Sequence, residues 1–454
     1  MRCYTTTVLT PVSLRLEVNM KSILLVRPAS WSGMTATPTG LLCVASYLMQ
    51  AGHTVKVLDL NCHDEAEVDQ LLETGEYGIV GVSMLSFHRA QPYGLINRIK
   101  DTYGDQIKVV VGGVHATSVP DLLVDRYPVD AVVIGEGEIT FKELADFWLK
   151  GEGGPLHSIR GLYTRENRRH PFRPVIADLD TMPLPDYGQL DLDQYYSVMV
   201  RNRSNYVHRG VPFRDAKFAN LNSSRGCLGR CTFCNAFVHW RGETRAYSAD
   251  ALFQHLVHLH EQWGRNLFYF NDDAFGQDPQ LVIDLCKKIH EAKLPIAWFA
   301  DTRVDVVTDE SLHWMSEAGC FCLSYGVESC SQTILDNMKK GTSVDQVVNA
   351  FAMTKKWGIK AYALLMIGNV GETDETIQET HRVMCQIQPD IRTYVGVVWV
   401  LPGTQLEQLY INEHGFDREY WATPTDGVPE FYHGFGSEDV QRWQQVIDSI
   451  PSRW

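Results

Sequence analysis

Short apolar runs alternate with amphipathic stretches along most of the chain. In the first region these apolar runs lie at 22–27, 54–59, 79–83, 108–111 and 131–134. Stretches with helical periodicity separate them, for example 40–51 and 90–103. Apolar strands that alternate with amphipathic helices are typical of a parallel sheet covered on both faces. The pattern therefore predicts a doubly wound, Rossmann-like α/β domain over residues 20–150.

A second alternation of the same kind begins near residue 216. Its apolar runs lie at 218–223, 266–271, 296–300, 321–327, 361–367 and 393–401. Six parallel strands with intervening helices predict a partial (β/α)6 barrel over 216–409. Residues 151–215, rich in Gly, Pro, Arg and Asp, are predicted to be a linker. Residues 410–454 form a short aromatic segment, which we expect to pack across the open side of the barrel.

The first nineteen residues differ from the rest of the chain. They contain Arg2 and Arg15 but no apolar core followed by a small-residue cleavage site, so a signal peptide is not predicted. Met20 stands directly before the first apolar run. We expect translation to start at Met20 and residues 1–19 to be a disordered extension.

The composition narrows the class of protein. A chain of 454 residues has room for two or three domains. Its net charge of −14 argues against a nucleic-acid partner, which requires a cationic surface. No apolar run approaches the roughly 18 residues that a membrane span needs. The eleven cysteines lack the even, close spacing of a disulfide framework, so a reducing, cytoplasmic location is predicted.

Three cysteines stand close together at Cys227, Cys231 and Cys234, in a C-x-x-x-C-x-x-C spacing. Three such thiolates can hold three irons of a [4Fe–4S] cluster and leave the fourth iron without a protein ligand. An open coordination position marks a catalytic rather than a structural metal. A structural zinc site is the alternative, but it usually needs a second C-x-x-C pair or added histidines, and no second pair is present.

Unusual residues follow the predicted strands of the first region. They are Ser83-Met84-Leu85, Gly112-Gly113-Val114-His115 and Gly135-Glu136-Gly137-Glu138. Parallel sheets bind ligands beyond the carboxyl ends of their strands, and paired glycines let a bulky ligand approach the backbone. A flavodoxin-like domain, whose loops are also rich in glycine, is the alternative.

Charged residues follow the predicted strands of the barrel in the same way. Asp272 and Asp273 follow the second strand, Arg303 the third and Glu328 the fourth. Active-site residues of such barrels cluster at the carboxyl ends of the strands. Each residue also has a structural alternative, because acids cap helices and exposed charges form salt bridges.

Taken together, these motifs resemble the cobalamin-dependent (B12-binding) radical S-adenosylmethionine (SAM) enzymes, methyltransferase-like (class B). Arg225-Gly226 before the first cysteine and Phe233 before the third match the radical SAM motif. Ser83-Met84-Leu85 and Gly112-Gly113 match the S-x-L/T and Gly-Gly signatures of the cobalamin-binding domain. The resemblance covers nearly all of residues 21–409. It implies a [4Fe–4S] cluster, SAM and cobalamin as cofactors, and reduced flavodoxin or ferredoxin as the electron donor.

The resemblance also implies roles for single residues. The three cysteines would bind the cluster, Phe233 would pack near the adenine, and Glu328 would hydrogen-bond the ribose hydroxyls. Asp272 and Asp273 would serve the SAM ammonium group, and Arg303 its carboxylate or a neighbouring contact. Many relatives have Pro where this chain has Val370, which leaves the shape of that turn open. The residues expected beside cobalamin are Thr37, Pro38, Ser83, Leu85, Gly112, Gly113, Val114, His115, Gly135 and Glu136.

The chain departs from one family pattern. Corrinoid proteins that place a histidine below the cobalt carry D-x-H-x-x-G after the first strand, and here the loop 35–40 has neither Asp nor His. His63, after the second strand, is expected at the surface. We therefore expect cobalamin to bind with its dimethylbenzimidazole displaced and with no histidine in its place.

The sequence leaves three functional classes open. The first is a C-methyltransferase that uses methylcobalamin and a 5′-deoxyadenosyl radical on a small biosynthetic substrate. The second is a cobalamin-assisted cyclase or ring-rearranging oxidoreductase. The third, a non-enzymatic corrinoid carrier or sensor, is disfavoured because a carrier has no use for the cysteine triad. A methylthiotransferase is disfavoured because the first domain lacks additional cluster cysteines, and Cys43 and Cys62 are isolated.

Overall fold

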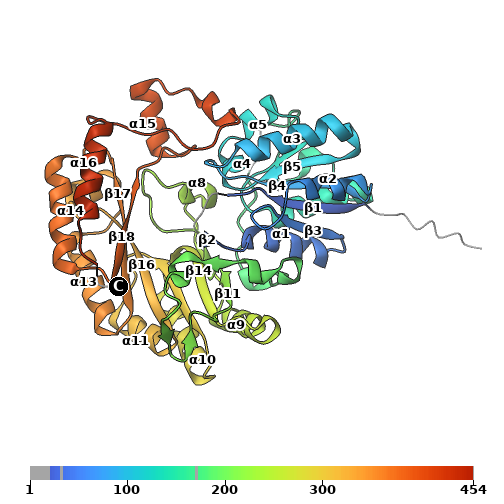
Figure 1. Cartoon of the computed structure of the whole chain (residues 1–454). Coiled ribbons are helices and arrows are strands. Elements are labelled where there is room, and N and C mark those ends of the chain that lie inside the picture. Colours follow the sequence, from blue (N-terminus) through green and yellow to red (C-terminus); the bar gives the residue numbers. More distant parts are fainter. Residues whose placement is uncertain (1–20, 31–33, 169–171, 453–454) are drawn as a thin grey trace, which may run out of the picture.

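The chain forms two α/β domains that lie side by side, each built on a six-stranded sheet (Figure 1). The computed structural model describes residues 21–30, 34–168 and 172–452. The expected extension at 1–19 lies outside the described residues. Among those that are described, no helix is both long enough and apolar enough to cross a membrane.

The first sheet has the strand order β3-β1-β4-β5-β6-β7. Its first five strands are parallel, and β7 runs antiparallel to β6. In β1, Ile23 and Leu25 pack with one core while Leu24 and Val26 pack with another, because successive side chains point to opposite faces. Both faces are thus buried, as the apolar runs predicted. The strands are β1 (Ser22–Arg27), β3 (Val55–Asp59), β4 (Tyr77–Ser83), β5 (Lys108–Gly112), β6 (Ala131–Val133) and β7 (Leu162–Tyr163).

Helices cover both faces of this sheet. Helices α1 and α6 contact one another on one face, and residues of α2, α3 and α5 belong to the core on the other. This arrangement confirms the predicted doubly wound domain. The helices are α1 (Thr39–Gln50), α2 (Ala66–Glu73), α3 (Ala90–Tyr103), α4 (Val114–Ser118), α5 (Pro120–Arg126) and α6 (Glu138–Ala145).

The second sheet has the order β11-β14-β15-β16-β17-β18, and all its neighbours are parallel. Six strands in sequence order confirm the predicted partial barrel. Two boundaries were clearly wrong. β14 extends to Phe275, so Asp272 and Asp273 lie within the strand rather than after it, and β18 ends at Val397 rather than at 401. The strands are β11 (Phe218–Leu221), β14 (Leu267–Phe275), β15 (Ala297–Thr302), β16 (Cys320–Glu328), β17 (Lys360–Ile367) and β18 (Ile391–Val397).

The barrel helices begin at well-defined residues. Thr308, Ser343 and Thr373 each form a capping box with the residue three positions on, which satisfies free amides of the first turn. These caps determine where the loops after the strands end. The helices are α8 (Ala236–Trp240), α9 (Ala249–Trp263), α10 (Pro279–Glu291), α11 (Asp309–Glu317), α12 (Gln332–Asn337), α13 (Val344–Lys356), α14 (Asp374–Ile387), α15 (Gln405–His414) and α16 (Ser437–Asp448).

The segment predicted to be a linker contributes to the first domain. Its strand β7 extends the first sheet, so that sheet continues past the expected boundary at 150. Strand β8 (Tyr196–Ser197) pairs with β2 (Met34–Thr35). Tyr187 and Tyr195 are buried in the apolar core that both domains share. The segment therefore packs the domains together rather than merely connecting them.

The aromatic C-terminal segment divides its contacts between the two domains. Helix α16 packs on α14 and β18 of the barrel. The stretch 415–432, which we call the strap, instead returns to the first domain, and Figure 1 shows it running from α15 towards α5. Trp421 is fully buried in the core of the first domain, beside Tyr93 and Tyr127. The expectation that all these aromatics close the barrel was therefore wrong for the strap.

Candidate cofactor-binding site between the two sheets

The strand-end loops of both domains line one cavity of about 450 Å³. From the barrel side, Asn222, Ser224, Arg225, Asn271 and Asp273 reach it. From the first domain, most of the residues expected beside a corrinoid reach it. These are Thr37, Pro38, Ser83, Leu85, Gly112, Gly113, Gly135 and Glu136.

Val114 and His115, which were also expected there, do not line the cavity. His115 is fully buried, with Nε2 2.8 Å from the Tyr93 hydroxyl and Nδ1 3.1 Å from the Ser86 hydroxyl. Burial, aided by the charge of Arg89, lowers the pKa of His115 to about 3, so the ring is neutral. Both ring nitrogens therefore have partners within the first domain, and neither faces the cavity.

Other histidines do reach the cavity, and sequence reasoning missed them. His88, His239 and His255 line it. Burial lowers the pKa values of His239 and His255 to about 4, so both are neutral near pH 7. His63 lies elsewhere and pairs with Glu67 on the first turn of α2. No short motif surrounds these three histidines that would have marked them.

The two paired glycines have different surroundings. Gly113 has a φ of +94°, and a Cβ there would lie 2.9 Å from the carbonyl oxygen of Met84. That carbonyl also accepts a hydrogen bond from the His115 amide. A Cβ on Gly112 would meet nothing closer than 3.8 Å. Gly113 is therefore required by the loop itself, whereas Gly112 leaves space at the cavity wall.

The loop that carries Thr37 and Pro38 is tied to the barrel. The Thr37 amide and hydroxyl both donate to Asn220 Oδ1, at 2.6 and 2.8 Å. Thr39 donates to Asn222 Oδ1 at 2.7 Å. Asn220 is fully buried in β11. These bonds fix the first loop of one domain against the first strand of the other.

A buried ion-pair network joins the domains beside the cavity. Arg225 donates to Glu136 and to Glu138, both at 2.7 Å, and Arg245 donates to Glu136 at 2.8 Å. Burial alone would lower the pKa of Arg225, but the charges of Glu138 and Glu136 raise it well above its usual value. Arg225 stands two residues before Cys227, so the network also anchors the start of the cysteine loop.

The three cysteines lie on one loop after β11. The Gly229 amide lies 3.3 Å from Cys227 Sγ, and a Cβ on Gly229 would be within 3.6 Å of both Cys227 and Cys231 sulfurs. Burial raises the pKa of Cys231, and raises that of Cys234 to about 11. Cys231 and Cys227 both lie close enough to Cys234 to raise its pKa further, and three neighbouring thiols on one loop suit an iron–sulfur cluster.

Asp272 and Asp273 accept hydrogen bonds from the residues that lead into this loop. Asp272 is buried and accepts from the amides and hydroxyls of Ser223 and Ser224, at 2.6 to 3.2 Å. Burial nevertheless raises the pKa of Asp272 to about 6. Asp273 accepts from the Gly226 amide at 3.3 Å and also lines the cavity. Of the two carboxylates, Asp273 is the one that faces open space.

Glu328 and Arg303 meet a residue that sequence reasoning missed. Lys340 is buried and donates to Glu328 Oε1 at 2.8 Å. Glu328 has a φ of +65°, a rare backbone conformation for a side chain of this kind and one that often occurs at functional sites. Nothing in the sequence distinguishes Lys340 from the exposed Lys339 beside it.

Arg303 stands between this pair and the cysteine loop. It donates to both carboxylate oxygens of Asp305 at 2.9 Å and to the carbonyl of Lys340 at 2.9 Å. Its remaining Nη1 faces the loop, because a Cβ on Gly229 would lie 2.9 Å from it. The charges of Glu328, Lys340 and Arg303 thus all lie close to Cys231.

Phe233 lies in the cysteine loop, and Val370 lies in the turn after β17. Phe233 is half-buried and packs against two buried apolar clusters, one that contains Val398 and Leu406 and one that contains Leu335 and Met338. In that turn Glu372 accepts from the amides of Gly368 and Asn369, at 2.6 and 2.9 Å, and burial raises its pKa to about 7. The turn that holds Val370 is therefore shaped by a buried carboxylate.

Comparison with known proteins gives matches over both domains. The model of the B12 binding domain matches residues 31–145, and that of the Radical SAM superfamily matches residues 221–384. An uncharacterized methyltransferase of Pyrococcus horikoshii is 30% identical over 94% of this chain and 91% of its own length. An anaerobic magnesium-protoporphyrin IX monomethyl ester cyclase of Rubrivivax gelatinosus is 27% identical over 79% of this chain and 63% of its own.

A solved structure shares the two-domain fold. The radical SAM methyltransferase TsrM from Kitasatospora setae, with cobalamin and a [4Fe–4S] cluster bound, superposes with a TM-score of 0.68. The match covers 86% of this chain and 75% of TsrM at 19% sequence identity. The likeness at this identity concerns the fold.

Proposed function

This chain belongs to the cobalamin-dependent radical SAM enzymes, and we propose that it is a C-methyltransferase acting on a small biosynthetic substrate. The family and the fold class are those that the sequence predicted. The proposal rests on one observation: the loops of both cofactor-binding domains open onto the same cavity. A substrate in that cavity would lie within reach of both domains.

The residues present fit the three cofactors. Cys227, Cys231 and Cys234 would hold a [4Fe–4S] cluster, and the open cavity wall at Gly112 and Gly135 would admit a corrinoid. When bound, the cluster and SAM supply a 5′-deoxyadenosyl radical, and cobalamin supplies a methyl group. In this scheme the protein positions the reactants and excludes water, and no side chain acts as a nucleophile.

The SAM contacts follow from the charges beside the cysteine loop. We assign Glu328 to the ribose hydroxyls and Asp273 to the ammonium group. Arg303 Nη1 would serve the carboxylate, and Phe233 would lie by the adenine. Asp272 has a different role in this proposal, because its carboxylate already accepts four hydrogen bonds from Ser223 and Ser224. It positions the cysteine loop.

The alternative is a cobalamin-assisted cyclase or ring-rearranging enzyme. The likeness to the Rubrivivax gelatinosus cyclase favours it, because that match extends over most of this chain. The two classes differ in the fate of the SAM methyl group. Methyl transfer adds one carbon to the product, and cyclisation adds none.

The deciding experiment is anaerobic product mass spectrometry with methyl-labelled SAM and candidate substrates. A methyltransferase should give a labelled product, with one S-adenosylhomocysteine and one 5′-deoxyadenosine per turnover. A cyclase should give 5′-deoxyadenosine without stoichiometric S-adenosylhomocysteine and an unlabelled product. The second result would overturn the methyltransferase assignment while leaving the family unchanged.

We further propose that the enzyme works in the cytoplasm with reduced flavodoxin or ferredoxin as electron donor. The half-buried cysteines support a donor that docks near the loop. Substituting either reduced protein for a chemical reductant should sustain 5′-deoxyadenosine formation. Failure of both donors would contradict this part of the proposal.

A further inference from the structure

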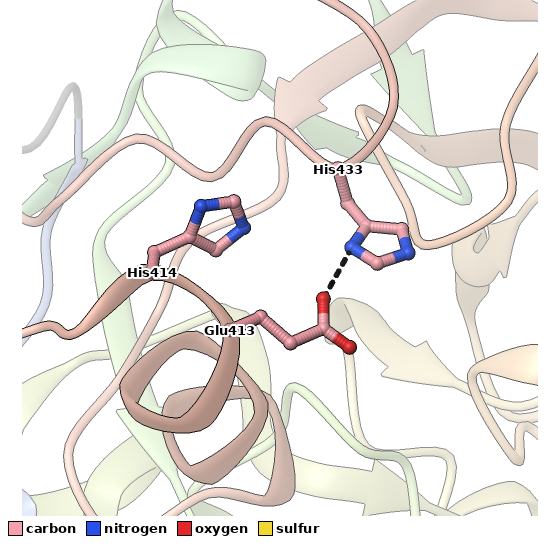
Figure 2. A group of neighbouring side chains, drawn as sticks. All are labelled: Glu413, His414 and His433. Atoms are coloured by element: carbon pink, nitrogen blue, oxygen red, sulfur yellow. Dashed lines mark ion pairs between the residues drawn. The ribbon is translucent and has the colours of Figure 1, made fainter.

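Two histidines and a glutamate converge at the surface, where helix α15 ends (Figure 2). Glu413 and His414 are the last two residues of that helix, and His433 lies just after the strap. His433 Nδ1 is 2.9 Å from a carboxylate oxygen of Glu413. One ligand atom from each side chain lies within 4.8 Å of the other two. This group is outside the cavity and takes no part in the proposed reaction.

We propose that Glu413, His414 and His433 bind a divalent transition metal, with Zn²⁺ as the best match. Two imidazoles and one carboxylate form a three-residue ligand set that tetrahedral zinc uses, with water in the fourth position. Calcium and magnesium prefer all-oxygen sites, so the imidazoles disfavour them. The proposal is independent of the proposed function.

Neighbouring aromatic rings hold the ligands in position. His433 is stacked with Phe431, with ring centroids 5.9 Å apart and an interplanar angle of 3°. Phe431 is fully buried, and Tyr410 lies 5.1 Å from the His414 ring. Ligands that are already ordered lose less conformational entropy when a metal binds.

The metal would close a loop in the chain. His414 and His433 stand at the two ends of the strap, so a shared ion would join those ends directly. A link of this kind restricts the unfolded chain more than the folded one. The strap carries Tyr420 and Trp421, which Arg89 of the first domain contacts at 4.5 and 5.3 Å from their ring centroids. Metal binding should therefore strengthen the attachment of the strap to the first domain.

Zinc titration of the full chain tests the site. The protein is first loaded with its cluster and with hydroxocobalamin, stripped of loose metal with a chelator, and titrated with Zn²⁺ in a calorimeter. We expect one Zn²⁺ per chain, with affinity lowered roughly tenfold or more in His414→Ala and in His433→Ala. Unchanged iron content and cluster absorbance would show that zinc has not displaced iron from the cysteines.

A matched control distinguishes this site from an ordinary surface pair. His63 pairs with Glu67 at 3.0 Å but is not part of a described three-ligand group, so His63→Ala should leave the Zn²⁺ titration unchanged. Absence of a Zn²⁺ site in the wild type, or wild-type Zn²⁺ affinity in the His414→Ala and His433→Ala variants, would overturn the proposal.

Hydrogen exchange tests the consequence for the strap. Added Zn²⁺ should slow amide exchange within residues 415–432 of the wild type and leave it unchanged in His433→Ala. Zinc binding without slower exchange in the strap would overturn the loop-closing role.

Discussion

The two domains present very different surfaces to the cavity that they share. On the first domain the wall consists mainly of glycines and of small or apolar side chains, such as Ser83, Gly112 and Gly135, and the charged Arg27 and Glu136 also reach it. On the barrel the surroundings are charged, with Asp273 at the cavity and Arg303 and Glu328 beside the cysteine loop. The first surface suits a large ligand recognised by shape, and the second suits a small, charged one recognised by ion pairs and hydrogen bonds. With the cofactors placed as proposed, the two domains would recognise their ligands in two different ways at neighbouring loops.

The largest expected effect concerns the cysteine loop on the charged surface of the barrel. Replacing Cys227, Cys231 and Cys234 together by Ala should abolish iron binding and reductive SAM cleavage, because no other described cysteines share this loop. Iron analysis and 5′-deoxyadenosine formation measure the two losses. Cobalamin binding should remain, since its proposed residues lie on the other domain.

A cysteine control belongs with that variant. Cys320 and Cys322 are buried in the barrel strand β16, and Cys385 lies on α14. Cys385→Ala should retain the full cluster. A triple variant that keeps its cluster would refute the assignment of the loop.

The next largest effect concerns the paired glycines on the first domain, where we expect a ligand to be recognised by its shape. Gly113→Ala should weaken cobalamin binding and cost about 1–3 kcal/mol of stability, because it forces a side chain into the left-handed region against Met84. Gly112→Ala is the matched control, since its new methyl group meets nothing closer than 3.8 Å. Cobalamin titration and thermal unfolding of both variants provide the measurement. Equal effects at the two positions would contradict the loop argument.

A larger side chain at Gly112 separates binding from stability. Gly112→Leu should reduce cobalamin affinity while changing the unfolding temperature little, because its side chain would occupy the cavity rather than the core. Full cobalamin affinity in this variant would place the corrinoid elsewhere.

A moderate effect is expected at Glu328. Glu328→Gln should weaken SAM binding by about 1–3 kcal/mol, the usual loss for a hydrogen bond to a charged group, and should leave the cluster intact. Glu310→Gln, at an exposed position in the first turn of α11, is the control. Equilibrium binding of SAM to the cluster-loaded protein measures the difference. Normal SAM affinity in Glu328→Gln would exclude the proposed ribose contact.

The smallest expected effect is the absence of a signal. Cobalamin should bind without a histidine below the cobalt, so the electron paramagnetic resonance spectrum of the cob(II)alamin form should show no nitrogen superhyperfine splitting from a lower ligand. Of the three histidines that line the cavity, His88 is the one in the first domain and is the residue to replace, whereas His63 and His115 lie away from the cavity. Splitting that disappears in His88→Ala would contradict the prediction.

Local patterns in the sequence were enough to predict the elements. The strand Ser22–Arg27 and the helix Ala90–Tyr103 occur at their predicted residues, because a strand buried on both faces leaves a continuous apolar run and a helix buried on one face leaves a helical apolar period. The cysteine loop and the Gly-Gly turn were visible for the same reason, since each is a short motif.

Contacts between distant segments could not be predicted in this way. Lys340 reaches Glu328, and Arg225 reaches Glu136, only after the chain has folded. His115 stands within a glycine motif, yet its position is determined by Tyr93 and the strap. The placement of the strap depends on Arg89, whose burial nothing in its neighbourhood indicates.

The buried position of Trp421 has a consequence for how the protein is made. Its indole fills the core of the first domain and donates to Glu407 at 2.6 Å, although more than half of the chain separates it from that domain in sequence. Domains generally fold as they leave the ribosome, the amino-terminal one first. Here the apolar surface of the first domain is covered only after the strap has been synthesised. A chain whose synthesis stops early would therefore expose that surface to chaperones and proteases.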